Sequence, residues 1–324
     1  MSKSARAASP VASAPVSGTQ PGLVVAGFGR HVLVETESGK RLICHPRGKK
    51  SKVVVGDRIR WLPSEDEGTI EQIEDRSNLF YRQDEMRTKS FAANLDQVLI
   101  LIAAEPEFSE SQLTRALIAA EAERIKPIIA LNKSDLVEPF GRAWIRLAPY
   151  RTMGYQMLPL AIKPKDSTAV EDDAQKAELM ALLHAKKTLV LGPSGAGKSS
   201  LTNLLVPNAR VLTAEISQAL NSGKHTTTST TLYWVDEART TALIDSPGFQ
   251  EFGLHHIDPM QLANYMPDFK MHAQDCKFYN CTHLHEPGCG VISEVKLPVG
   301  ASSISANRYR LYSELFAELS QTRY

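Results

Sequence analysis

The chain has 324 residues, of which 43% are hydrophobic, so it is long and apolar enough for two or three globular domains rather than one. Its 37 basic residues nearly match its 36 acidic residues, which excludes a global attraction to nucleic acid and leaves any such binding to local patches. No apolar run approaches about 18 residues, so we expect no membrane span and no membrane partner.

Residues 1–20 predict a disordered tail, because they are rich in Ala, Ser, Pro and Val and contain no acid. They lack the continuous apolar core that marks a secretory signal. An organelle transit peptide has a similar composition and remains an alternative, so cleavage of this tail stays open.

Residues 21–87 predict a small OB-type β-barrel that binds RNA. Five short segments alternate in strand fashion between Gly-bearing turns: 23–25, 31–35, 41–44, 57–61 and 69–73. The segment 40–52 holds six basic residues and no acid, which suits an RNA backbone. Aromatic or imidazole side chains are expected beside it, namely Phe28, His31 and Trp61. A solvated basic loop is the alternative.

Residues 88–255 predict a nucleotide-binding α/β domain. Strand-like apolar runs alternate there with helical ones, and this alternation implies a parallel sheet. The pattern predicts a strand over 95–104 and an amphipathic helix over 109–124, with Ser109 as its N-cap.

The apolar run 127–131 leads into the guanine-reading pattern N-K-x-D, formed by Asn132, Lys133, Ser134 and Asp135. The Asp carboxylate of this pattern accepts two N–H groups that guanine has and adenine lacks, so Asp135 predicts selectivity for guanine. We expect Lys133 to lie along the base and Asn132 to tie this loop to the phosphate loop. A chance four-residue match in a loop is the alternative, and the phosphate loop argues against it.

Residues 158–162 stand where a GTPase usually carries a Ser-Ala pair that contacts the guanine oxygen. The serine is absent and Ala161 remains. Because the expected contact comes from the backbone N–H, Ala161 is still a candidate guanine contact.

Residues 192–199 fit the P-loop pattern G-x-x-x-x-G-K-[ST] without a mismatch. An apolar run precedes them and a helix start follows, which argues against a chance Gly-rich turn. The glycines let the backbone wrap a triphosphate, and N–H groups at the helix N-terminus point toward it. We expect Lys198 to reach the β- and γ-phosphates and Ser199 to bind Mg²⁺. The candidate nucleotide-binding residues here are Gly192, Pro193, Ser194, Gly195, Ala196, Gly197, Lys198, Ser199 and Ser200.

Residues 245–248 match the DxxG element of a second switch. Asp245 is expected to hold Mg²⁺ through water, and the Gly248 N–H to face the γ-phosphate. The polar segment 222–228 predicts a first switch, with Thr227 as the favoured Mg²⁺ ligand. A plain Ser/Thr-rich loop is the alternative.

Phe249 stands where many GTPases carry a Gln that orients the attacking water. Phe cannot do this, so we expect slow intrinsic hydrolysis unless another group positions the water. His225 is the candidate within the chain, and a partner acting in trans is the other possible source. A solvated loop histidine is the alternative reading of His225. The candidate catalytic set is therefore Lys198, Ser199, His225, Thr227, Asp245 and Gly248.

The order of these motifs predicts a circularly permuted domain. The base-reading motif ordinarily follows the P-loop and DxxG, and here it precedes both. Chain ends that lie close together make such a permutation physically tolerable. Permutation also puts DxxG at the exit of the domain, so movement of this switch can pass directly into residues 256–324.

Residues 256–324 predict a helical domain built around a structural zinc site. The pattern C-x4-C-x-H-x5-C offers three thiolates and one imidazole, the set for a closed tetrahedral site, in Cys276, Cys281, His283 and Cys289. A disulfide would leave one of the three clustered cysteines unpaired, and a catalytic zinc would need an open position. His285 is a rival for His283. Cys44 lies in an apolar run, and we expect it to be buried.

Two helices are expected in this domain. Asp258 and Pro259 predict the start of a short helix, as N-cap and first helical residue. A last helix over about 305–320 carries an apolar stripe that we interpret as packing. Arg308 and Arg310 on this helix are candidate phosphate contacts.

The order of OB-like barrel, permuted GTPase domain and zinc knuckle resembles the ribosome-small-subunit-dependent GTPase A family of bacteria. The resemblance covers nearly the whole chain from about residue 21. Its most specific residues are 132–135, 192–200, 225–228, 245–254 and Cys276/Cys281/His283/Cys289. It implies a role in late maturation of the small ribosomal subunit, with rRNA contact and GTP hydrolysis stimulated by the subunit. The serine missing before Ala161 and the long tail depart from the family pattern.

Three functions compete at this point. The first is a cytoplasmic, monomeric GTP hydrolase that acts as a ribosome-assembly switch, with one structural Zn²⁺ and with Mg²⁺ bound beside GTP. The second is a GTP-gated RNA-binding module in which occupancy matters and turnover does not. The third is an ATP-using metabolic enzyme, and Asp135 argues against it. The first two functions are distinguished by whether His225 or a partner supplies a group that orients the attacking water; if neither does, the second is favoured.

Overall fold

The computed structural model describes most of the chain, with gaps. The described residues are 17–28, 31–48, 52–64, 67–85, 87–162, 169–209, 230–248, 251–298 and 302–321. Most of the expected tail, all of the expected first switch with His225 and Thr227, and Phe249 therefore lie outside the described residues.

The first five strands close into a barrel, as the sequence predicts. Strand β1 pairs with both β2 and β4, and the order around the barrel is β1-β2-β3-β5-β4, with β3 and β5 parallel. This is a small Greek-key barrel of the OB type. The strands are β1 (Gln20–Phe28), β2 (His31–Glu35), β3 (Arg41–Pro46), β4 (Arg58–Leu62) and β5 (Gly68–Ile73).

The barrel surface differs from the RNA-binding surface expected from the sequence. Trp61 is only 5% exposed and its indole N–H donates to the carbonyl of Pro21, so its ring belongs to the barrel core, together with the fully buried Cys44. The interpretation of Trp61 as an aromatic partner of RNA is therefore wrong. Arg41 is also committed, because it forms an ion pair with the buried carboxylate of Glu35 at 2.8 Å.

A two-stranded hairpin links the barrel to the central sheet. It consists of β6 (Leu79–Gln83) and β7 (Thr88–Ala93), and it spans the boundary expected between residues 87 and 88. Phe80 and Phe91 from the hairpin pack against Phe252, with ring centroids 5.9 and 6.1 Å from that of Phe252. This aromatic cluster anchors the chain segment that follows the DxxG motif.

The central sheet is continuous with the barrel. Its strand order is β10-β9-β8-β11-β13-β12, and β12 then pairs with β1 of the barrel. All neighbours are parallel except at β12, which runs antiparallel to β13. These strands are β8 (Gln97–Ala103), β9 (Lys126–Asn132), β10 (Gln156–Leu160), β11 (Lys187–Leu191), β12 (Thr231–Trp234) and β13 (Ala242–Asp245).

Strand β8 shows why this sheet needs helices on both faces. Val98, Ile100 and Ile102 point into one core, while Leu99 and Leu101 point into another. A strand buried on both sides is apolar at every position, which is typical of parallel sheets covered by helices.

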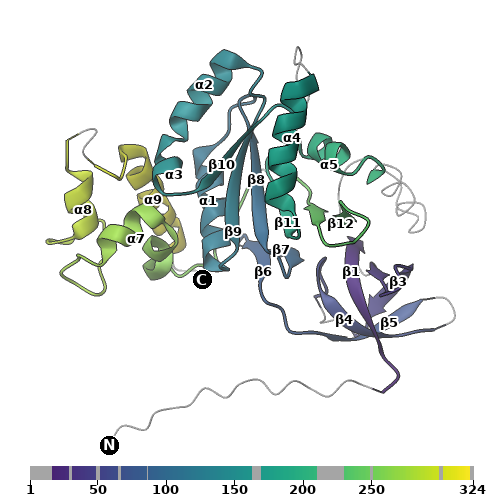
Figure 1. Cartoon of the computed structure of the whole chain (residues 1–324). Coiled ribbons are helices and arrows are strands. Elements are labelled where there is room, and N and C mark those ends of the chain that lie inside the picture. The colour runs from purple at the N-terminus through teal and green to yellow at the C-terminus, as the bar shows by residue number, and fades with distance from the viewer. Residues whose placement is uncertain are drawn as a thin grey trace, which may run out of the picture.

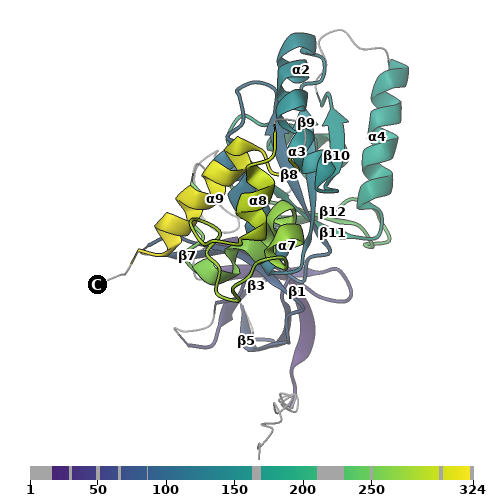
Figure 2. The same cartoon turned by 90° about the vertical axis from the view of Figure 1, so that its left-hand side faces the viewer.

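The helices cover the two faces of the sheet unequally. In Figure 1 the C-terminal helices lie to the left of the sheet, and α4 and α5 lie to its right. Figure 2 shows α7, α8 and α9 in front of the sheet when it is viewed from that left-hand side. The helices of the nucleotide domain are α1 (Glu110–Ala122), α2 (Val137–Arg146), α3 (Ala148–Thr152), α4 (Ala169–Leu183) and α5 (Lys198–Leu205).

The C-terminal region is helical, and its elements are η1 (Pro259–Tyr265), α7 (Pro267–Ala273), α8 (Gly290–Val295) and α9 (Ala306–Leu319). Asp258 caps η1 by accepting from the Met260 N–H at 2.9 Å, although this expected helix is of the 3-10 type. No helix among the described residues has the length and apolar character needed to cross a bilayer.

Arg308 corrects a further expectation. Its side chain is 3% exposed and forms a bidentate ion pair with Asp268 at 2.8 and 3.0 Å. The same guanidinium donates to the Thr114 hydroxyl of α1 at 2.8 Å. Arg308 therefore joins the C-terminal region to the nucleotide domain, and its interpretation as a phosphate contact is wrong.

Candidate nucleotide and metal sites

The three nucleotide motifs lie at one edge of the central sheet. The base-reading motif begins at the last residue of β9, the P-loop follows β11, and DxxG begins at the last residue of β13. These strands are parallel, so their carboxyl ends share an edge, which is where ligands bind in open α/β sheets. The permuted order along the chain is thus compatible with a single site.

The P-loop has a shape that requires glycine at particular positions. A Cβ on Gly192 would lie 2.1 Å from the carbonyl oxygen of Leu101 on β8. Gly197 has φ of +106°, and a Cβ there would lie 2.5 Å from the side-chain nitrogen Nδ2 of Asn132. A side chain at either position would push the loop away from its neighbours, so the loop could no longer wrap a phosphate chain.

The remaining P-loop residues lie in the turn and in the first turn of the following helix. Lys198 opens α5, so its side chain and the helix N-terminus face the same space. Pro193, Ser194, Gly195 and Ala196 form the turn, and Ser199 and Ser200 follow in the helix.

The side chain of Lys198 is buried against the loop that it serves. It is 9% exposed, and its Nζ donates to the carbonyls of Gly192 and Pro193 at 2.8 Å each. Burial lowers the pKa of Lys198, and the nearby carboxylate of Asp245 opposes that shift. A buried ammonium whose hydrogen-bond acceptors are neutral carbonyls is suited to meet added negative charge.

Asp245 is a buried carboxylate with unused hydrogen-bonding capacity. It is 6% exposed, and its Oδ1 has no hydrogen-bond partner among the described residues. Burial raises the pKa of Asp245 to about 6. An orphaned buried carboxylate oxygen fits a hydrated cation, because a cation would repay the desolvation cost.

The DxxG element lies over the P-loop. A Cβ on Gly248 would lie 3.1 Å from Nζ of Lys198 and 3.4 Å from the backbone nitrogen of Ser194. Two residues earlier, the Ser246 hydroxyl donates to the Val190 carbonyl of β11 at 2.8 Å. These contacts bring the last motif of the chain against the phosphate-binding loop.

Asn132 connects the base-reading loop to two others. Its Nδ2 donates to the carbonyl of Ala196 at 2.9 Å, and its Oδ1 accepts from the Ile162 N–H at 3.1 Å. Lys133 adopts a left-handed conformation, with φ of +68°, and the Ser134 N–H donates to Leu160. Asp135 follows in the same tight turn, so the loop presents Lys133 and Asp135 from a braced backbone.

One part of this site could not be anticipated from the sequence. The Ala161 N–H donates to Oε1 of Gln175, on α4, at 3.0 Å. Gln175 thus takes the one hydrogen of the backbone group expected to contact guanine, in a loop that lacks the usual serine. No local pattern marks Gln175, because the contact depends on how α4 packs beside the end of β10.

The cysteine cluster has the geometry of a metal site. The ligand atoms of Cys276, Cys281, His283 and Cys289 all lie within 4.8 Å of one another. Nδ1 of His283 lies 3.4 Å from the sulfurs of Cys276 and Cys289, and those two sulfurs are 3.8 Å apart. Sulfurs about 2.3 Å from a tetrahedral metal are separated by nearly that distance, and a disulfide of about 2.05 Å is excluded. The cluster could hold a metal ion.

The loop around this cluster is braced by residues that sequence reasoning missed. Glu286 accepts hydrogen bonds from the backbone N–H of Thr282 at 2.9 Å and from its hydroxyl at 2.6 Å. Tyr309 donates to the His283 carbonyl, and Tyr312 donates to the Thr282 carbonyl, each at 2.9 Å. The rival His285 is outside the cluster and its side chain is 80% exposed. The position of Glu286 between two metal-ligand candidates was the available signal for its role.

Comparisons with known proteins agree with this architecture. The model of the RsgA GTPase family matches residues 73–255. A protein of Variovorax paradoxus (strain S110), called small ribosomal subunit biogenesis GTPase RsgA, is 74% identical over 303 residues, covering 94% of this chain and 93% of that protein. A protein with the same name from Paraburkholderia xenovorans (strain LB400) is 49% identical over 313 residues, covering 95% of this chain and 96% of its own length.

Two solved structures share the fold. YjeQ from Thermotoga maritima has a TM-score of 0.69 at 28% identity, covering 94% of this chain and 100% of that one. YloQ, described as a circularly permuted GTPase, has a TM-score of 0.66 at 26% identity, covering 95% of this chain and 98% of that one. The P-loop, base-reading and DxxG motifs meet at one edge of the sheet although their order along the chain is permuted, and the relatives match this chain over most of its length. These two findings lead to one conclusion. This chain belongs to the RsgA GTPase family and hydrolyses GTP.

Proposed function

We propose that this protein uses GTP hydrolysis as a switch in late maturation of the small ribosomal subunit, binding rRNA and responding to the subunit with faster turnover. The observation that carries the proposal is the Asn132 bridge, which joins a guanine-reading loop to a phosphate loop. The partner is inferred from relatives named small ribosomal subunit biogenesis GTPase, of which one is 74% identical.

Guanine recognition is assigned to residues 132–135 with Ala161. The Asp135 carboxylate accepts two N–H groups of the base, and Lys133 lies along the ring. The Ala161 N–H contacts the guanine oxygen after it has left Oε1 of Gln175, since a backbone amide has one hydrogen to donate. Adenine presents the wrong donor pattern and would leave these groups unpaired, which costs about 1–3 kcal/mol for each. GTP and GDP share the base, so both are ligands.

Hydrolysis is assigned to the P-loop and the switches. Water attacks the γ-phosphorus, the bond from that phosphorus to the β–γ bridging oxygen breaks, and GDP and phosphate leave. Lys198 and the backbone N–H groups of the P-loop from Ser194 onward stabilise the charge that develops on the phosphoryl oxygens. The Gly248 N–H faces the γ-phosphate, and His225 or a group on the partner orients the water.

Magnesium is assigned to Ser199, Thr227 and Asp245, the last through water. Oδ1 of Asp245, which has no hydrogen-bond partner among the described residues, and the raised pKa of this side chain support the assignment. A carboxylate buried away from water is strongly stabilised by a nearby cation. The ion supplies neutralisation of charge on the β- and γ-phosphates.

Structural zinc is assigned to Cys276, Cys281, His283 and Cys289. The sulfur-to-sulfur and sulfur-to-nitrogen distances suit a tetrahedral site, and four protein ligands leave no open position for catalysis. An ion held by these four residues would tie together the connection between α7 and α8 and so support the fold of the C-terminal region.

The domain division proposed is a tail over 1–20, an RNA-binding barrel over 21–87, the GTPase domain over 88–255 and the zinc-binding helical domain over 256–324. We propose that the protein acts as a monomer in the cytoplasm, since its partner is a ribosomal particle. GTP holds the switches and, through them, the arrangement of barrel and C-terminal domain that binds the particle; hydrolysis releases it.

The test is steady-state hydrolysis of GTP, with ATP in parallel, in the presence and absence of purified small ribosomal subunits. We expect slow GTP turnover that small subunits raise at least tenfold, and no comparable ATP turnover. Large subunits serve as the matched control. Turnover that small subunits leave unchanged would overturn the switch and favour a GTP-gated RNA-binding module.

A further inference from the structure

The chain segment that leaves the DxxG motif is held on one side by the β6–β7 hairpin. The Gln83 N–H donates to the Gly253 carbonyl, and the His255 N–H donates to the Gln83 carbonyl, each at 3.0 Å. The Gly253 N–H donates to the Asp84 carboxylate at 3.1 Å. This segment therefore continues the edge of β6 as a short parallel pairing.

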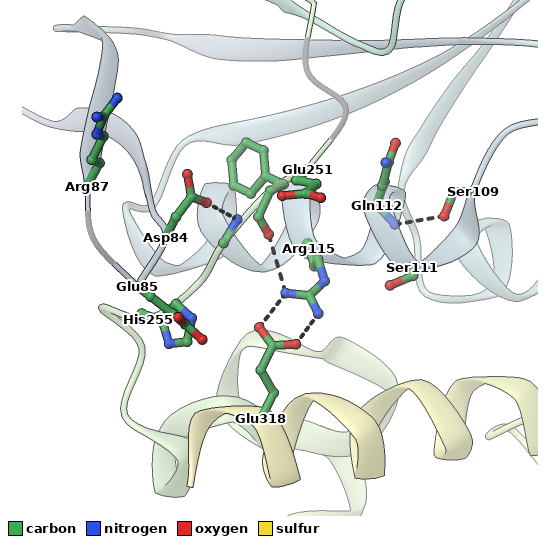
Figure 3. A pocket seen from close by; sticks show the side chains of 12 residues that line it. Asp84, Glu85, Arg87, Ser109, Ser111, Gln112, Arg115, Glu251, His255 and Glu318 are labelled. Carbon is green, nitrogen blue, oxygen red and sulfur yellow. Dashed lines mark hydrogen bonds and ion pairs between the residues drawn. The ribbon is translucent and has the colours of Figure 1, made fainter. Parts of the chain in front are cut away.

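On its other side, the same segment meets Arg115 of α1 (Figure 3). Nη1 of Arg115 lies 3.4 Å from the carbonyl oxygen of Phe252, which follows Gly248 by four residues. The guanidinium also forms a two-pronged ion pair with Glu318, in the last turn of α9, with one contact of 2.9 Å and a second, shorter one. One side chain thus touches both the segment after DxxG and the C-terminal helix.

The surroundings of Arg115 leave room for movement. The pair forms part of the wall of a cavity of about 590 Å³, which Figure 3 shows between α1, the hairpin and α9. Arg115 is 18% exposed and Glu318 is 32% exposed, and hydrogen bonding to Arg115 lowers the pKa of Glu318. A planar guanidinium that binds a carboxylate by both prongs constrains direction as well as distance.

We propose that Arg115 is a positioning residue that couples the segment after DxxG to helix α9 through Glu318. A change in the position of Phe252 alters the guanidinium contact, and the paired carboxylate carries that change to α9. The inference rests on the proposed role of residues 245–248 as a nucleotide-sensing switch. It adds to that role a specific mechanical connection to the C-terminal domain.

The nearby Arg308 contact has a different role. Arg308 links α7 and α9 to α1 through Asp268 and Thr114, and it is nearly inaccessible to solvent. Its contacts hold the C-terminal region on the nucleotide domain but do not include the segment after DxxG. Arg115 differs because its three partner atoms include the main-chain carbonyl oxygen of Phe252 in that segment.

Hydrogen–deuterium exchange of the full-length protein tests the coupling without ribosomes. The chain is compared with bound GDP and with a non-hydrolysable GTP analogue, each with Mg²⁺. We expect exchange to differ between the two nucleotides both at 251–257 and at 311–321. In E318Q, and separately in R115K, the difference at 311–321 should fall by roughly threefold or more while that at 251–257 persists.

The matched controls are E314Q and R310K, the same changes in an exposed ion pair of 2.6 Å on the same helix. Both should keep the response of wild type at 311–321. If 251–257 responds to nucleotide but 311–321 does not, or if E318Q and R115K keep the full response there, the coupling is overturned and the proposed function stands. If neither segment of the wild-type chain responds, the switch assignment fails together with the coupling.

Discussion

The side-chain nitrogen of Asn132 lies 2.9 Å from the carbonyl oxygen of Ala196, although 64 residues separate them along the chain. Its oxygen meanwhile accepts from Ile162, so one amide braces the base-reading loop, the P-loop and the Ala161 loop. The consequence is that guanine recognition and phosphate binding depend on each other's geometry.

Asn132→Ala should therefore weaken guanine nucleotides although this side chain need not touch the base. The substitution leaves a buried carbonyl and a partly buried N–H unpaired, and we expect GDP and GTP affinity to fall by roughly tenfold, about 1.4 kcal/mol. Calorimetric titration with both nucleotides measures this. Asn203→Ala removes a similar amide that bonds to Ser199 on exposed helix surface, and it should change affinity little. Equal losses in both variants would contradict the bridge.

Asp135→Asn should change which base is bound. The amide offers a donor where guanine also has donors, whereas xanthine has an oxygen there, so we expect GTP to weaken by about 100-fold or more and xanthosine triphosphate to gain. Competition between the two nucleotides for the variant measures this change in base preference. Unchanged GTP affinity would remove Asp135 from the base pocket.

Cys281→Ser should lose the metal. A serine oxygen is a poor zinc ligand, so elemental analysis of the purified variant should find well below one zinc per chain, against about one for wild type. Cys44→Ser is the control, because Cys44 is buried in the barrel away from the cluster, and it should keep its zinc. Full zinc in Cys281→Ser would rule out Cys281 as a ligand.

Asp245 makes the nucleotide-free protein less stable at neutral pH. Its pKa of about 6 in the folded chain exceeds the ordinary value of 3.8, so the folded state binds this proton more tightly than the unfolded state. The free energy of unfolding therefore decreases as pH rises from about 4 to about 6, and it stays lowered above that range.

Asp245→Asn should remove this cost. We expect the variant, free of nucleotide and Mg²⁺, to gain on the order of 2 kcal/mol in unfolding free energy at pH 7.5, and clearly less at pH 4.5. Urea unfolding at both pH values measures the difference. The same variant should lose Mg²⁺-dependent GTP turnover. A gain that does not depend on pH would show that the stabilisation has another origin.

Asp268→Asn should destabilise the C-terminal region strongly. Asp268 is 2% exposed and Arg308 is 3% exposed, so the change leaves a buried guanidinium without its counter-charge, at a cost of roughly 3 kcal/mol. The midpoint of urea unfolding should fall accordingly. Glu314→Gln breaks the exposed pair with Arg310 and should cost at most about 0.5 kcal/mol. Similar midpoints for both variants would contradict the structural role of Arg308.

Local patterns were sufficient wherever a motif needs particular residues at particular spacings. The P-loop was recognisable because its glycines, lysine and serine stand at fixed spacings within the eight residues 192–199. The N-cap at Ser109 was also local, since the side chain accepts from the Gln112 N–H only three residues later. Such features depend on which residues stand within a short stretch of chain, so the sequence is enough to recognise them.

Patterns failed where a side chain's partner lies far along the chain. Trp61 and Arg308 both resembled nucleic-acid contacts. Trp61 is instead packed in the barrel core, and Arg308 is paired with Asp268. An aromatic or basic residue has the same letter whether it is buried or exposed, and its environment depends on which elements pack around it.

The sequence by itself determined the chemistry of this protein: a guanine-reading loop, a phosphate loop and a cysteine-histidine cluster, in a permuted order. The tertiary structure decided which groups act together. Gln175 braces Ala161, Glu35 receives the Trp234 indole across the barrel boundary at 2.7 Å, and Arg115 joins Phe252 to Glu318. Each of these contacts joins elements that are remote in sequence. Only the packing of the helices, the barrel and the central sheet brings their atoms within hydrogen-bonding distance.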